Sequence, residues 1–198
     1  MYLGLDLSMS STGWACWNGE SAQPRYGHWV LGSEFTSDGR VFVKLHERLA
    51  EQHMIMPFEV IFTEEAINAA SLSGHTNIRT LRLASGLAAH VHSFATAYSL
   101  RPVMEFNIES WRPPFIGRMH SSDAKREARL ARKEGDKRAS ARGTLKALTI
   151  ARCKQLGLNP RKDDEADAIG ILTHGLLVKG ITPPWCADEV LQAVLEVA

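Results

Sequence analysis

The sequence has few cysteines, almost no net charge and no long apolar run. Its 198 residues include three cysteines, which form no C-x-x-C pair and leave an odd count. The pattern argues against a disulfide framework and a structural zinc site, and we expect a reducing, cytoplasmic environment. No stretch reaches the roughly 20 apolar residues that span a bilayer, and Asp6 interrupts the only candidate for a signal segment.

Positive and negative charges are balanced along the chain. There are 23 Lys and Arg against 22 Asp and Glu, a net charge of +1. No global field therefore favours a nucleic-acid or membrane partner, and any such signal must be local. With 44% hydrophobic and 23% charged residues, the composition is that of an ordinary globular protein. The length fits a single domain over residues 1–198 with a sizeable core.

Hydrophobic spacing predicts an α/β fold. Short apolar runs between turn-forming residues predict strands at residues 2–7, 13–17, 26–31, 58–63 and 103–108. Apolar residues at three- and four-residue steps predict helices at 41–54, 76–97, 144–156 and 164–178, with a short tail helix at 188–197. The first three strands follow one another through hairpins. The later two alternate with helices, which predicts a parallel pair with a right-handed crossover.

The segment after the fifth predicted strand breaks this regularity. Trp111-Arg112-Pro113-Pro114 carries two prolines, which remove two backbone donors, so we expect it to end regular structure and to leave Trp111 exposed. Residues 118–142 are rich in Arg and Lys and contain almost no large apolar side chain. We expect this basic insertion to form either a solvated helix or a mobile loop.

Carboxylates stand beside strongly apolar segments. Asp6 lies inside the first predicted strand, and Glu64 follows the apolar run of the fourth. Asp164 and Asp167 open a predicted helix and share one of its faces. Burying an unpaired carboxylate costs several kcal/mol, so such groups are neutralised by a partner, a proton or a metal. A parallel sheet would bring Asp6 and Glu64 side by side.

Four converging carboxylates outline a nuclease site. Their mutual repulsion is usually relieved by hard divalent cations with oxygen ligands. Two Mg²⁺ or Mn²⁺ ions about 4 Å apart would activate a water and stabilise the leaving oxygen in phosphodiester hydrolysis. Simpler roles remain open for some acids: Asp163 or Asp164 as a helix cap, and Glu65 as a surface residue.

These acids belong to three longer motifs. The motifs are Gly4-Leu5-Asp6-Leu7-Ser8 with Thr12-Gly13-Trp14, then Ile61-Phe62-Thr63-Glu64-Glu65, then Asp164-Glu165-Ala166-Asp167-Ala168 with Thr173-His174. In this order they resemble the motifs of RuvC-type Holliday junction resolvases, in the ribonuclease H-like superfamily, over most of the chain. The resemblance implies a mixed five-stranded sheet, three antiparallel strands and then βαβ units, flanked by helices.

The resemblance also implies a chemistry. Asp6, Glu64, Asp164 and Asp167 match the family's metal ligands, and Lys146 resembles its basic residue near the scissile phosphate, with an ordinary exposed lysine as the alternative. The implied enzyme is a crossover junction endodeoxyribonuclease that uses two Mg²⁺ ions per site, with Mn²⁺ as a substitute. Paired nicks that leave 5′-phosphates on a four-way junction favour a homodimer.

Three departures from the family concern the grip on DNA. Leu7 and Ser8 replace a family proline and glycine, and Ile67 replaces an aromatic wedge three positions after the catalytic Glu. The basic insertion looks longer than the family loop. Clustered cations beside a carboxylate site neutralise phosphates without reading sequence. The alternative is an ordinary solvated helix face. The predicted DNA contacts are Arg126, Arg129, Arg132, Lys133 and Arg138.

Other functions share parts of this pattern. The same site would serve on flaps, forks or an RNA/DNA hybrid, and a module that binds branched DNA without cutting it is a further alternative. The first strand also resembles the phosphate loop of the actin and sugar-kinase superfamily, but the second phosphate motif is missing. His174 is expected to be a packed histidine. A host repair enzyme and a phage enzyme that clears branched DNA both fit, and the basic insertion favours a phage.

Overall fold

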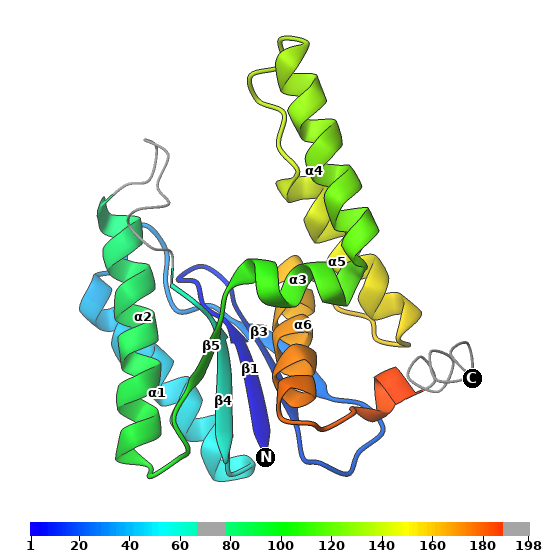
Figure 1. The fold of residues 1–198 in the computed structure, drawn as a ribbon. Helices are drawn as coiled ribbons and strands as arrows, with labels where there is room; N and C mark the ends of the chain where they lie inside the picture. The colour runs from blue at the N-terminus through cyan, green and yellow to red at the C-terminus, as the bar shows by residue number, and fades with distance from the viewer. Residues whose placement is uncertain (67–77, 188–198) are drawn as a thin grey trace.

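The computed structural model describes residues 1–66 and 78–187. Five strands form one mixed sheet in the order β3-β2-β1-β4-β5 (Figure 1). The strands are β1 (Tyr2–Asp6), β2 (Thr12–Trp17), β3 (Arg25–Trp29), β4 (Val60–Glu64) and β5 (Met104–Phe106). The β1–β2 and β2–β3 pairs are antiparallel, whereas β1–β4 and β4–β5 are parallel. The predicted sheet of three antiparallel strands followed by βαβ units is confirmed.

Helices cover both faces of this sheet (Figure 1). On one face lie α1 (Asp38–Ile55) and α2 (Ile78–Ala97). On the other lies α6 (Asp163–Val178), with α3 (Ile108–Ile116) and α5 (Arg142–Gln155) packed around it. A 3-10 turn, Pro184–Cys186, follows α6. The predicted tail helix at 188–197 lies outside the described residues.

The central strands are apolar at successive positions because each of their faces meets a helix layer. Leu3 and Leu5 of β1 are fully buried on the α1–α2 side. On β4, Ile61 faces the same side, whereas Phe62 packs under α6. A charged side chain at the end of such a strand is therefore held in a precise place by the packing on both faces.

Glycines let α6 lie directly on the sheet. A Cβ atom at Gly13 of β2 would overlap the backbone carbonyl of Asp164, and one at Gly4 of β1 would stand 2.7 Å from the carbonyl oxygen of Ala168. Because these atoms are backbone, they have no rotamer by which to give way. The first turn of α6 is thus seated on the edge of the sheet where β1 ends.

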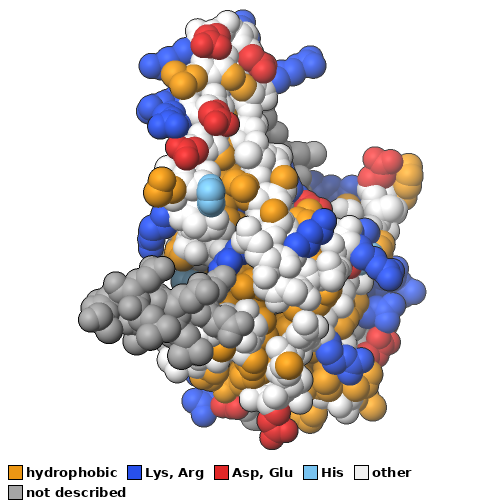
Figure 2. Space-filling model, turned by 90° about the vertical axis from the view of Figure 1, so that its right-hand side faces the viewer, with side chains coloured by type: hydrophobic (Ala, Val, Ile, Leu, Met, Phe, Trp, Pro, Cys, Tyr) orange, Lys and Arg blue, Asp and Glu red, His pale blue; other side chains and the backbone are white. Residues whose placement is uncertain are grey.

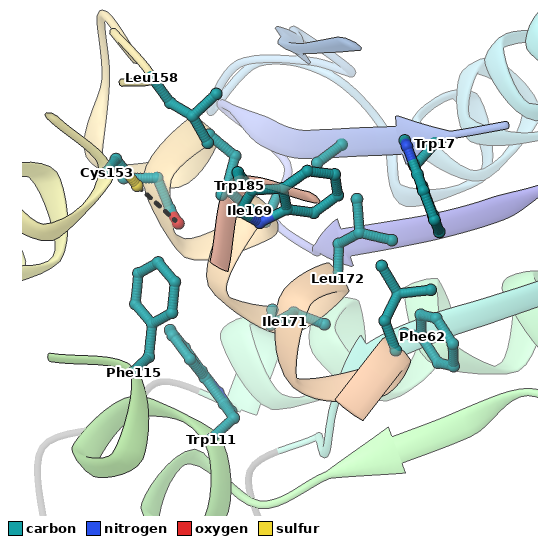
Figure 3. Packing of buried hydrophobic residues seen from close by; sticks show 14 of the residues in the cluster. Trp17, Phe62, Trp111, Phe115, Cys153, Leu158, Ile169, Ile171, Leu172 and Trp185 are labelled. Carbon is teal, nitrogen blue, oxygen red and sulfur yellow. Dashed lines mark hydrogen bonds between the residues drawn. The ribbon is translucent and has the colours of Figure 1, made fainter. Parts of the chain in front are cut away.

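The prediction that Trp111-Arg112-Pro113-Pro114 ends regular structure and exposes Trp111 was wrong. Both prolines lie inside α3, and Trp111 is fully buried. Figure 3 shows Trp111 and Phe115 between α3 and α6, in the core cluster of that face. The two missing N–H groups would have reached carbonyls of exposed residues at the helix start, which water can satisfy. Burial of the aromatic rings outweighs those lost bonds.

The basic insertion is helical over most of its length. Helix α4 (Arg118–Lys133) begins after Gly117, whose φ of 91° turns the chain away from α3. Together with the returning segment 134–141, α4 forms an arm that projects from the body of the protein (Figure 1). Of the two predicted alternatives, the solvated helix is confirmed for α4.

Two expectations about composition can also be checked. Cys16, Cys153 and Cys186 are buried and form no disulfide among the described residues. Within residues 1–66 and 78–187, no helix has the length and apolar character needed to cross a membrane.

Candidate active site

Three elements bring the predicted carboxylates to one edge of the sheet. Asp6 is the last residue of β1 and Glu64 the last of β4, and these strands pair in parallel with Leu5 opposite Thr63. Asp6 also pairs with Gly13 of β2, the position whose missing side chain admits the start of α6. The predicted placing of Asp6 beside Glu64 on parallel strands is confirmed, and the start of α6 lies at the same edge.

Three of these acids have raised pKa values. Burial raises the pKa of Asp6 well above its usual value, and the negative charges of Asp167, Glu64 and Asp164 raise it further. Burial also raises the pKa of Glu64, and it raises that of Asp167 to about 7 although Arg112 lowers it. An edge of the sheet that concentrates unbalanced negative charge is suited to binding a cation.

Arg112 is a functional candidate that the sequence patterns did not single out. Its guanidinium group donates a hydrogen bond of 2.6 Å to Oδ2 of Asp167, and both side chains are almost fully buried. The other oxygen, Oδ1 of Asp167, is buried and has no hydrogen-bond partner among the described residues. The only available sequence signal was indirect, because a buried acid needs a partner. Two helices separate Arg112 from Asp167 in the sequence, and no sequence pattern links the two residues.

Trp111 holds the carboxylate of Glu64. Its indole Nε1 donates a 2.9 Å hydrogen bond to Oε2 of Glu64. The same ring lies 4.6 Å from the guanidinium carbon of Arg112, a cation–π contact. Two consecutive residues of α3 therefore contact carboxylates from β4 and α6.

The other acids at the start of α6 have partners of their own. Asp163 forms an ion pair with Lys146, and this hydrogen bond, with further ones from backbone N–H groups, lowers the pKa of Asp163. The N-cap of α6 is Lys162 and Asp163 lies in the first turn, so the alternative of Asp163 or Asp164 as the helix cap was wrong. Glu165, only 4% exposed, receives 2.7 Å contacts from His28 Nδ1 and from the backbone N–H of Arg161. The acidic run thus divides, and Asp164 and Asp167 remain as the acids that act on Asp6.

Lys146 lies close to this edge but is already paired with Asp163. Its Nζ bonds Asp163, one position before the predicted ligand Asp164. It is therefore more than an ordinary exposed lysine, while its role near a phosphate stays a prediction. His174 packs edge-on against Phe106 with ring centroids 4.7 Å apart, and burial lowers its pKa, so the packed histidine is confirmed. Ile67 lies outside the described residues.

The predicted DNA-binding residues lie on the arm, away from the carboxylates. Ser121 and Ala124 form the buried face of α4, and its basic side chains project to solvent (Figure 2). Arg126 pairs with Asp123 at 2.9 Å, and Arg132 donates to the carbonyl of Ala139 at 2.7 Å. The predicted contacts, all exposed, are Arg126, Arg129, Arg132, Lys133 and Arg138.

The donor chemistry of the site fits a hard divalent cation. Asp6, Glu64, Asp164 and Asp167 offer only carboxylate oxygens, and one of these oxygens is buried without a partner. As the described side chains stand, however, no three His, Cys, Asp or Glu groups are arranged to hold a metal. Binding a cation therefore requires these side chains to draw together.

Comparison with known proteins supports the fold. No family model matches the chain, and the search of curated proteins found no match. Among solved structures, Thermus thermophilus RuvC is 17% identical, with a TM-score of 0.54 over 92% of this chain and 98% of that one. T. thermophilus RuvC in complex with a Holliday junction substrate is 15% identical, with a TM-score of 0.52 over 87% and 90%. The chain therefore shares the fold of these RuvC structures.

Proposed function

We propose that this protein is a metal-dependent endonuclease that resolves four-way DNA junctions. The observation that carries the proposal is the meeting of Asp6, Glu64, Asp164 and Asp167 from three elements at one sheet edge. Burial raises the pKa values of Asp6, Glu64 and Asp167 there, and neighbouring acids raise those of Asp6 and Asp167 further. The likeness of the fold to a RuvC bound to a Holliday junction supports the choice of substrate.

The chain's residues suggest how the site would work. Asp6, Glu64, Asp164 and Asp167 would hold the divalent cations, Mg²⁺ or Mn²⁺. When bound, such cations activate a water and stabilise the leaving oxygen of the phosphodiester. Asp6 ends a central strand that is packed on both faces, so its backbone is fixed and only its side chain would have to turn toward a cation. Lys146, which pairs with Asp163, would contact a phosphate near the acids.

The arm would supply the grip on DNA. Its exposed cations stand away from the buried acids, so they would bind phosphates flanking the cleaved one and release counterions. A junction cut in two strands needs two sites, so we propose a homodimer. The excess of Lys and Arg over Asp and Glu on the arm would let a chain with a net charge of only +1 bind DNA locally.

The test is nicking of a labelled four-way junction with Mg²⁺, alongside a fork, a flap and an RNA/DNA hybrid. We expect the native protein to nick the junction most rapidly and Asp6→Asn to be inactive, with Arg101→Lys, at the opposite end of the sheet, as an active control. Absence of Mg²⁺-dependent nicking on every branched substrate would refute the nuclease. Preference for the fork or hybrid would retain the chemistry and replace the substrate.

A further inference from the structure

One short helix contacts both sides of the acidic edge. Trp111 and Arg112 are neighbours on α3, yet the first bonds Glu64 at the end of β4 and the second bonds Asp167 on α6. Each donor holds one oxygen of its carboxylate. In Asp167 the remaining oxygen, Oδ1, is buried and lacks a hydrogen-bond partner among the described residues. The helix thus holds one oxygen of Asp167, and the other has no donor among the described residues.

We propose that Trp111 and Arg112 are positioning residues that orient Glu64 and Asp167 for binding a divalent cation. The inference rests on the proposed function, because it concerns the same site. Donors that hold the outer oxygen of a metal-binding carboxylate fix its direction and tune its basicity. Arg112 also carries a positive charge that limits the repulsion among the acids while no cation is bound.

The surroundings of this pair make it stiff. The Trp111 ring lies flat against α6 at Gly170, where a Cβ would stand only 2.6 Å from the ring. Arg112 stacks on that ring and is 9% exposed. Pro113 and Pro114 follow directly and fix two φ angles of α3. Arg152 of α5 donates a 3.0 Å hydrogen bond to the carbonyl of Phe115, which ties the end of the helix down. Donors on such a frame have little freedom to drift.

A purely structural role makes a different prediction. If Trp111 and Arg112 only fill and neutralise the core, their replacement lowers the melting temperature without changing cation affinity beyond what any buried substitution does. If they orient the acids, conservative replacement weakens cation binding specifically. Cation affinity of the DNA-free protein, measured from the free Mn²⁺ signal in electron paramagnetic resonance, separates the two and does not depend on cleavage.

The first test compares Trp111→Phe with Trp185→Phe. Both tryptophans are buried and each donates one indole hydrogen bond, 2.9 Å to Glu64 and 3.0 Å to Thr173. The two changes therefore remove similar volume and one bond each, but only the first touches a carboxylate of the site. We expect Mn²⁺ affinity to fall roughly 10- to 100-fold for Trp111→Phe and to stay at the native level for Trp185→Phe.

The second test compares Arg112→Lys with Arg101→Lys. Lysine keeps the positive charge but lacks the planar fork of donors, so the change isolates orientation from electrostatic balance. Arg101 forms an exposed ion pair with Glu59 at 2.9 Å and serves as the matched control. We expect roughly 10-fold weaker Mn²⁺ binding for Arg112→Lys only. In cleavage assays kcat should fall while KM for the junction stays unchanged, because DNA is held elsewhere.

The outcomes separate this inference from the proposed function. Equal Mn²⁺ affinity in Trp111→Phe and Trp185→Phe, or native affinity in Arg112→Lys, would overturn the positioning role even if the protein nicks junctions. A native protein that binds Mn²⁺ but cuts nothing would refute the nuclease, while the affinity series would still decide the role of α3. A native protein that binds no Mn²⁺ would overturn the positioning role directly.

Discussion

The acidic edge of the sheet and the α4 arm handle charge in opposite ways. At the edge, Asp167 and Arg112 are both nearly buried and lie 2.6 Å apart. On the arm, Asp123 and Arg126 form a similar pair at 2.9 Å, but both side chains are about half exposed. Solvent screens the second pair and reduces its worth to a fraction of a kcal/mol. At the edge, the interaction energy depends on the position of each charge. On the arm, the electrostatic attraction for a phosphate backbone would depend on the number of exposed cations.

The largest expected effect on the nicking rate comes from removing an acid at the edge, with removal of an acid on the arm as the control. Asp167→Asn keeps the shape of the side chain but removes a proposed cation ligand, so we expect junction nicking to fall by on the order of 10³-fold or more. Asp123→Asn breaks the exposed pair and should leave the nicking rate unchanged. Single-turnover cleavage at saturating Mg²⁺ measures both. Similar rates for the two variants would erase the distinction between the regions.

A methyl group added in each region should also act differently. Gly13→Ala places a Cβ into the backbone of Asp164 and must push α6 off the sheet, so we expect a loss of about 3 kcal/mol of unfolding free energy. At Gly143, near the base of the arm, a Cβ meets nothing within 4 Å. Gly143→Ala should stabilise α5 by about 0.5–1 kcal/mol. Urea unfolding measures both changes, and a mild effect at Gly13 would contradict the close seating of α6.

The buried acids at the edge should control how the stability of the protein changes with pH. The folded pKa values of Asp6, Glu64 and Asp167 lie above their unfolded values of 3.8, 4.5 and 3.8, and that of Asp167 reaches about 7. The folded state therefore binds more protons, and this contribution to stability is lost as pH rises from about 4 to 7. In EDTA, Asp6→Asn should melt higher than the native protein at pH 8, with a smaller difference at pH 5.

Asp163 supplies the control for this titration. Its pKa is lowered by the hydrogen bond from Lys146, so its contribution is present above pH 3.8 and is lost only at lower pH. Asp163→Asn should therefore shift the melting temperature by the same amount at pH 5 and pH 8. Thermal melts of both variants check the contrast. A difference for Asp6→Asn that does not grow between pH 5 and pH 8 would contradict a raised pKa.

The smallest effect per residue is expected on the arm. Reversing Arg126, Arg129 and Lys133 to Glu should weaken junction binding and reduce the slope of log affinity against log salt by about 0.9 for each lost phosphate contact. The melting temperature should change little because these side chains are exposed. Fluorescence anisotropy at several salt concentrations measures the slope. An unchanged slope would leave the arm without a role in DNA binding.

The local elements could be predicted because their signals are local. Strand β1 and helices α1, α5 and α6 follow from apolar spacing, and the pairing of Asp6 beside Glu64 follows from the parallel β1–β4 crossover. Helix α3 could not be predicted in this way. Its two prolines argue against a helix, and only the packing of Trp111 against Gly170 of α6 reverses that preference.

The sequence by itself determined which side chains would carry negative charge and on which elements they would lie. Asp6 and Glu64 end two parallel strands, and Asp164 and Asp167 begin one helix, whatever the packing around them. Only the tertiary structure decided which side chains pair with the acids of α6: Lys146 with Asp163, His28 with Glu165, and Arg112 with Asp167. Such choices depend on contacts between residues far apart in the chain, where burial strengthens an ion pair and raises the cost of an unpaired oxygen.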